Sequence, residues 1–168
     1  MTRNLVLIRH AQAEAGTPDV DRPLTARGTA DAGALGRWLL AHDVRPDSVV
    51  VSPARRACQT WALAAAALPS PPPPRLDERI LADTVEDLSD VVGDADVDVG
   101  TLVLVGHNPA VHQFAVRLDA GPADRPASAR LEGGFPSAAV AILELAGAWA
   151  EVAERTGVLV EFATRADF

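Results

Sequence analysis

Three short stretches of the sequence carry side chains that can bind and attack an anionic group. The first is the pair Arg9-His10, the second is the segment 52–60, SPARRACQT, and the third is the segment 106–108, GHN. Each stretch directly follows an aliphatic run, so two of the four histidines in the chain occupy equivalent positions just past a predicted buried strand. This placement indicates a shared site.

The residue types in these stretches suit a phosphoryl group. A guanidinium offers a rigid pair of donors that matches two phosphate oxygens, and a neutral imidazole is a good nucleophile toward phosphorus. Neighbouring arginines should lower the pKa of His10, because a second positive charge is disfavoured there. Fixed cations around the equatorial oxygens would stabilise the transition state of phosphoryl transfer. The pattern therefore predicts phosphoryl chemistry, with arginines supplying the positive charge.

The elements that must position these residues are predicted strands. The aliphatic segments 5–8, 48–51 and 101–105 indicate strands that are buried on both faces. Two further strands are expected at 138–145 and 157–164. The helices expected between the strands span residues 25–42, with Thr25 as N-cap, 55–68, 85–92 and a stretch that ends near 118. We expect residues 119–134 to form a polar loop.

Repeated strand–helix units of this kind predict an α/β fold. We expect a three-layer α/β/α sandwich with a mostly parallel central sheet, as a single domain over residues 1–168. The carboxyl ends of parallel strands lie at one edge of such a sheet. Two histidines and at least two arginines can therefore converge there.

The composition narrows the possible function classes. The formal net charge of −8 argues against nonspecific nucleic-acid binding, and no apolar run reaches the length of a membrane span. The single cysteine, Cys58, cannot form an internal disulfide, so we expect a cytoplasmic protein. All 15 basic residues are arginines, so a bound anion must be held by Arg, His or backbone N–H groups.

Four motifs together resemble the histidine phosphatase superfamily, and within it the small SixA-type phosphohistidine phosphatases: LIRHAQA, DRPLTARG, SPARRACQT and VGHNPAV. The resemblance implies a phosphoglycerate mutase-like fold and a metal-independent phosphatase. It implies that His10 is the nucleophile that becomes transiently phosphorylated. It also implies that Arg9, Arg22, Arg56 and His107 hold the phosphate group, with His107 as the second catalytic histidine.

Two features bear on the substrate. The long helical insertion of the mutase-like members is missing, and the region 69–100 in its place should leave an open pocket, which suits a phosphorylated protein. Glu78 resembles the general acid of the mutase-like members, although a phosphohistidine with a protonated ring is a good leaving group without one. We expect phosphohistidine on a signalling or phosphotransfer protein as the substrate. The alternatives are a small phosphate ester, or a non-catalytic phosphate- or phosphoprotein-binding module.

The remaining candidate groups are expected to be structural. His42 and His112 fall at a helix end and on a helix face, and Arg55 should lie on the surface beside the pocket. We expect no metal site, because His107 and His112 are five residues apart and Cys58 has no partner cysteine. The sequence also lacks a dinucleotide fingerprint and a phosphate loop, so no cofactor is expected.

Overall fold

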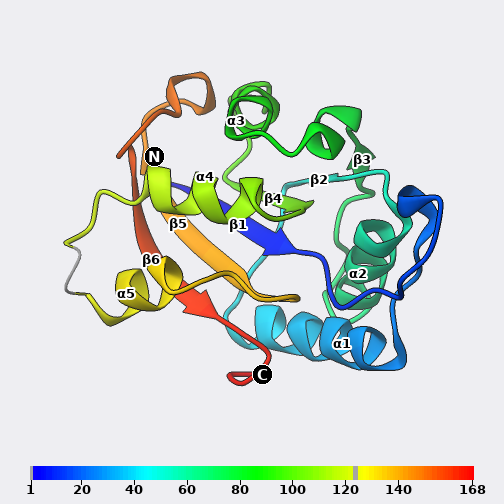
Figure 1. Cartoon of the computed structure of the whole chain (residues 1–168). Coiled ribbons are helices and arrows are strands. Elements are labelled where there is room, and N and C mark those ends of the chain that lie inside the picture. The colour runs from blue at the N-terminus through cyan, green and yellow to red at the C-terminus, as the bar shows by residue number, and fades with distance from the viewer. Residues whose placement is uncertain (1, 123–124) are drawn as a thin grey trace.

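The computed structural model describes residues 2–122 and 125–168 (Figure 1). The strands are β1 (Thr2–Arg9), β2 (Ser48–Val51), β3 (Arg75–Leu76), β4 (Thr101–Gly106), β5 (Val140–Ala146) and β6 (Gly157–Ala163). The α-helices are α1 (Ala26–Ala41), α2 (Arg55–Ala65), α3 (Val85–Gly93), α4 (Ala110–Leu118) and α5 (Pro126–Glu132). Short 3-10 helices are η1 (Asp19–Asp21), η2 (Glu78–Ala82) and η3 (Trp149–Glu151).

The strands of the described residues form a six-stranded sheet in the order β3-β2-β4-β1-β5-β6. The first four of these strands run parallel to one another, while β5 and β6 are antiparallel to their neighbours. The predicted α/β fold with a mostly parallel sheet is therefore confirmed. The carboxyl ends of β1, β2 and β4 lie at one edge of the sheet, as the site requires.

Helices cover both faces of the sheet (Figure 1). Alternate residues of β1 point to opposite sides: Leu5 and Leu7 pack toward α3, α4 and α5, whereas Val6 and Ile8 pack toward α1 and α2. Residues 5–8 of β1, 49–51 of β2 and 102–105 of β4 are continuously aliphatic, because each of these strands contributes side chains to both hydrophobic clusters. The prediction of a three-layer sandwich is confirmed. No helix among residues 2–122 and 125–168 combines the length and the apolar character needed to cross a membrane.

Part of the predicted loop 119–134 is helical, so that prediction was wrong. Helix α5 begins with Pro126 in its first turn, where a missing N–H costs nothing. Its Leu131 is 1% exposed and joins the core cluster that contains α4. The helix has only seven residues. It is too short to show a clear periodic pattern, and tertiary packing stabilises it.

The start of α1 agrees with the prediction that Thr25 is its N-cap. The Thr25 hydroxyl oxygen accepts a hydrogen bond from the backbone N–H of Gly28 at 2.9 Å. Further along the same helix, Gly36 faces α2, and a Cβ added there would lie only 2.3 Å from the carbonyl oxygen of Ala64. The close approach of the two helices therefore requires glycine at this position.

We predict that Gly36→Ala destabilises the protein by about 1–3 kcal/mol or more, because the added methyl group must push α1 away from α2. Gly33→Ala in the same helix is the matched control, since its Cβ would make only ordinary contact with the flexible side chain of Arg37. This control should be neutral or stabilise by up to about 1 kcal/mol. Urea unfolding of the two variants measures both effects, and equal stability of the two variants would contradict the packing argument.

Candidate active site

The register of β1 and β4 brings the two predicted histidines together. Arg9 pairs with Gly106 across the two strands, and the His10 backbone N–H donates to the Gly106 carbonyl at 3.0 Å. His10 and His107 therefore follow directly after neighbouring strand ends. Their ring centroids are 5.1 Å apart, and the two residues are 9% and 7% exposed.

Arg56 joins the two imidazoles. It lies in the first turn of α2, is 6% exposed, and comes from the segment that follows β2. Its Nε donates to His10 Nε2 at 3.2 Å, and its Nη2 lies 3.3 Å from His107 Nδ1. The neighbouring Arg55 is exposed, as predicted, because adjacent residues of a helix point in different directions.

These contacts assign the tautomer of each histidine. His10 Nδ1 lies 2.7 Å from the carbonyl oxygen of Ala11, so this nitrogen carries the proton and the lone pair is on Nε2. His107 accepts from Arg56 at Nδ1, and its Nε2 donates to the Ser52 hydroxyl at 2.7 Å. The free electron pairs of both rings therefore face the Arg56 guanidinium.

Both rings are neutral at physiological pH. Burial lowers the pKa of His10 to about 4, and the charges of Arg56 and Arg9 act in the same direction, although the hydrogen bond to Ala11 opposes them. Burial also lowers the pKa of His107 to about 3, with further contributions from His10 and Arg56. The expectation that nearby arginines lower the pKa of His10 agrees with the structure, but burial has the larger effect.

Asp19 links two of the three arginines predicted to bind phosphate, Arg22 and Arg56. Its carboxylate accepts from Arg22 Nε at 2.8 Å and from Arg56 Nη2 at 3.0 Å. Its backbone carbonyl also accepts from Arg56 Nη1 at 2.8 Å. Arg9 is anchored separately, because its Nη1 donates to the carbonyl of Phe135 at 3.0 Å.

These side chains line one cavity of about 440 Å³ at the strand ends. The cavity contains every residue predicted to bind phosphate, together with several other polar residues. Its polar lining residues are Arg9, His10, Gln12, Asp19, Arg22, Arg56, Asp83, His107, Asn108 and Ser137. The chemistry available there is the binding of a small, strongly charged anion next to an imidazole lone pair.

Glu78 is the one predicted site residue that lies outside this cavity. It is exposed at the start of η2 and is not among the described residues that line the cavity. The carboxyl group from this region that does line it belongs to Asp83. Sequence reasoning missed Asp83, Asp19 and Ser52, although Ser52 is the first residue of the SPARRACQT motif.

The last two residues of that motif hold the loops around the cavity. The Thr60 hydroxyl oxygen accepts from the Ala11 backbone N–H at 2.9 Å, next to His10. The Gln59 side-chain oxygen accepts from the Leu24 backbone N–H at 2.8 Å. The motif therefore supplies both an anion-binding arginine and the supports for the two loops that carry His10 and Arg22.

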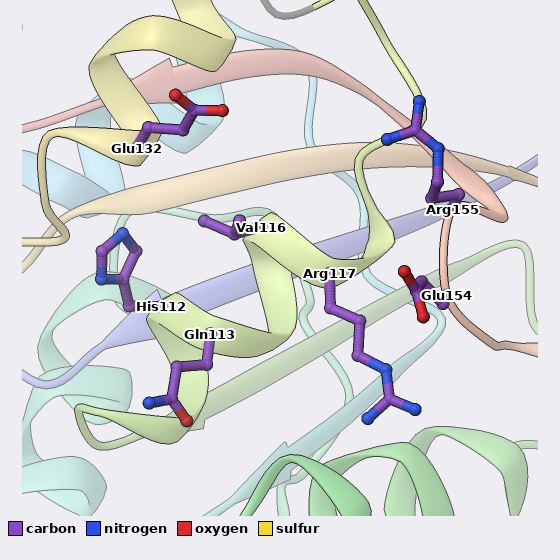
Figure 2. A pocket seen from close by; sticks show the side chains of 7 residues that line it. All are labelled: His112, Gln113, Val116, Arg117, Glu132, Glu154 and Arg155. Carbon is purple, nitrogen blue, oxygen red and sulfur yellow. The ribbon is translucent and has the colours of Figure 1, made fainter.

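A second cavity of about 590 Å³ lies along α4, between α5 and the segment before β6 (Figure 2). Its two arginines and its histidine have hydrogen-bond partners. Arg117 pairs with Glu86 at 3.2 Å, Arg155 donates to the Ala120 carbonyl, and His112 Nε2 lies 2.7 Å from the Leu131 carbonyl. The part of the chain that the structure describes holds no cluster of three or more potential metal ligands.

Comparison with known proteins assigns this chain to a protein family. The family model of the histidine phosphatase superfamily (branch 1) matches residues 5–92. The uncharacterized protein MT1313 of Mycobacterium tuberculosis is 35% identical over 158 residues, which cover 92% of this chain and 98% of the relative.

Solved structures agree with this match. A protein of Nakamurella multipartitia named as a phosphohistidine phosphatase SixA has a TM-score of 0.87 and 30% identity, covering 98% of this chain and 96% of that one. The protein histidine phosphatase SixA complexed with tungstate shares the fold, with a TM-score of 0.73 and 20% identity over 97% of each chain. The resemblance stated from the four motifs is confirmed.

We predict that neither His10 nor His107 takes up a proton between about pH 8 and pH 5.5, because a lowered pKa keeps the neutral ring populated to lower pH. Long-range ¹H–¹⁵N spectra at pH 7 should show His10 protonated at Nδ1 and His107 protonated at Nε2. The variants His10→Asn and His107→Asn assign the signals. A titration midpoint near the ordinary histidine value for either ring would contradict the geometry.

Proposed function

The chain belongs to the histidine phosphatase superfamily, branch 1, and is a SixA-type phosphatase, and from this membership we propose that it hydrolyses phosphohistidine on a signalling or phosphotransfer protein. The reaction runs through a phosphorylated intermediate on His10. The observation that carries the proposal is the contact of the buried Arg56 guanidinium with both imidazoles, because it puts a nucleophile and a cation beside the same small volume.

In the first step His10 Nε2 attacks phosphorus. The hydrogen bond from Nδ1 to the Ala11 carbonyl keeps the lone pair on Nε2 and holds the ring in place. The P–N bond of the substrate breaks as the new P–Nε2 bond forms, and the substrate imidazole leaves with its ring proton. Arg56 turns its Nε–H from Nε2 to a phosphoryl oxygen during binding.

The arginines supply the charge that this step needs. Arg9, Arg22 and Arg56 line the cavity from three separate segments, so they can surround the equatorial oxygens. His107 provides a further hydrogen-bond donor. A bound phosphoryl dianion favours protonation of His107 Nδ1, which otherwise accepts from Arg56, and this N–H then donates to a phosphoryl oxygen. The Ser52 hydroxyl holds the opposite side of the ring.

In the second step water attacks phospho-His10, the P–Nε2 bond breaks, and inorganic phosphate leaves. No step requires a metal ion or an organic cofactor. We further propose that residues 1–168 act as a single histidine phosphatase-like domain. The free thiol of Cys58 fits a reducing compartment, so we assign the enzyme to the cytoplasm.

We predict that His10→Ala lowers turnover of a phosphohistidine protein by at least about 1,000-fold, because the nucleophile is lost. The variant should still bind inorganic phosphate in calorimetry, since the arginines remain. His42→Gln is the matched control, because His42 stacks on Trp38 at 3.8 Å, outside the cavity, and should keep wild-type turnover. Full turnover by His10→Ala would refute the nucleophile assignment. Binding of phosphate without turnover by the wild type would instead indicate a binding module.

We also predict that dialysis against EDTA leaves kcat/KM unchanged, because guanidinium groups take the place of a metal ion at the phosphoryl oxygens. The measurement is steady-state hydrolysis before and after dialysis. A loss of activity that added Mg²⁺ restores would contradict the metal-independent mechanism.

A further inference from the structure

Asp83 occupies an unusual position next to the cavity. It is the residue at the C-terminal end of η2, and its backbone is left-handed, with φ 56° and ψ 40°. Few residues other than glycine adopt this conformation, and aspartate tolerates it better than most. The tight turn brings the Asp83 side chain to the cavity that holds His10 and His107, whereas Glu78 at the other end of η2 stays exposed.

One oxygen of the Asp83 carboxyl group is fixed and the other is available. Oδ1 accepts a hydrogen bond from the backbone N–H of Ala110 at 3.0 Å, at the start of α4. Among the described residues, Oδ2 has no hydrogen-bond partner. A carboxyl group anchored in this way can exchange a proton through Oδ2 without losing its position.

The surroundings also favour proton exchange. Burial raises the pKa of Asp83, although the Ala110 N–H and the charges of Arg56 and Arg9 oppose this effect. A phosphoryl dianion bound in the same cavity raises it further, because two negative groups disfavour each other. Asp83 therefore stays protonated at a higher pH than an exposed aspartate does.

We propose that Asp83 is a catalytic residue that protonates an oxygen leaving group, so that the enzyme also hydrolyses phosphate monoesters of alcohols. The inference rests on the proposed function, because His10 remains the nucleophile. As the P–Nε2 bond forms and the P–O bond breaks, the bond's electron pair stays on the leaving oxygen, which takes the proton from Asp83 Oδ2. The Asp83 carboxylate then takes a proton from the water that attacks phospho-His10, and this restores the acid.

The need for a proton depends on the leaving group, and this dependence supplies the test. An alkoxide is a poor leaving group without a proton, whereas p-nitrophenolate leaves unaided. The change Asp83→Asn removes the proton but keeps a side-chain oxygen to accept from Ala110 N–H, so the turn is preserved. The value of kcat/KM reports on phosphoryl transfer to His10, the step in which the leaving group departs.

We predict that Asp83→Asn lowers kcat/KM for a phosphoserine peptide by about 100- to 10,000-fold, but changes kcat/KM for p-nitrophenyl phosphate by only a few-fold. A series of aryl phosphates between these extremes should show a steeper dependence on leaving-group pKa in the variant than in the wild type. Asp90→Asn is the matched control, because it removes an exposed carboxylate on α3, and it should behave as wild type.

Several outcomes would overturn the inference. An equal loss on every substrate would mean that Asp83 only holds the turn, and no loss on the phosphoserine peptide would mean that it transfers no proton. A wild-type enzyme that hydrolyses a phosphohistidine protein but no alkyl phosphate would refute the inference and leave the proposed function intact. If Glu78→Gln rather than Asp83→Asn shows the selective loss, the acid is Glu78. Turnover of neither substrate class by the wild type would refute the proposed function itself.

Discussion

The buried guanidinium of Arg56 is the interaction on which the rest of the site depends. A buried cation must be surrounded by acceptors, and here the acceptors are two imidazole nitrogens and both a carboxylate and a backbone oxygen of Asp19. This arrangement turns the lone pairs of both histidines toward one point, and it adds to the effect of burial, which keeps both rings neutral. It also requires β1, β2 and β4 to end at the same level, because each of the three groups follows a different strand.

Asp19 gives the site a built-in counterion. Its carboxylate contacts Arg22 and Arg56, yet its side chain is 68% exposed, so it neutralises the arginines without closing the cavity. A phosphoryl group carries more negative charge than a carboxylate and offers more acceptor oxygens. We therefore expect substrate binding to exchange the hydrogen bonds to Asp19 for stronger ones to phosphoryl oxygens.

The sequence predicts those parts of the fold that follow from short-range residue patterns. Continuous aliphatic runs mark β1, β2 and β4, and the residues after them, His10 and His107, follow from the direction of the chain. Helix α5 was missed because its seven residues depend on packing against the core. Asp83 was missed for a similar reason. A left-handed turn at the end of η2 brings its side chain to the cavity, and no residue pattern predicts that turn. The resemblance pointed instead to Glu78, because a motif carries residue order but not the path of the chain.

The most direct measurement of the central claim is the location of the phosphoryl group during turnover. The enzyme is mixed with substrate, quenched in alkali on the millisecond timescale, since phosphohistidine survives alkali, and digested for mass spectrometry and ³¹P NMR. The account predicts a phosphoryl group on Nε2 of His10, the nitrogen that faces Arg56. A phosphoryl group on any other residue, or its absence from the enzyme while product accumulates, would contradict it.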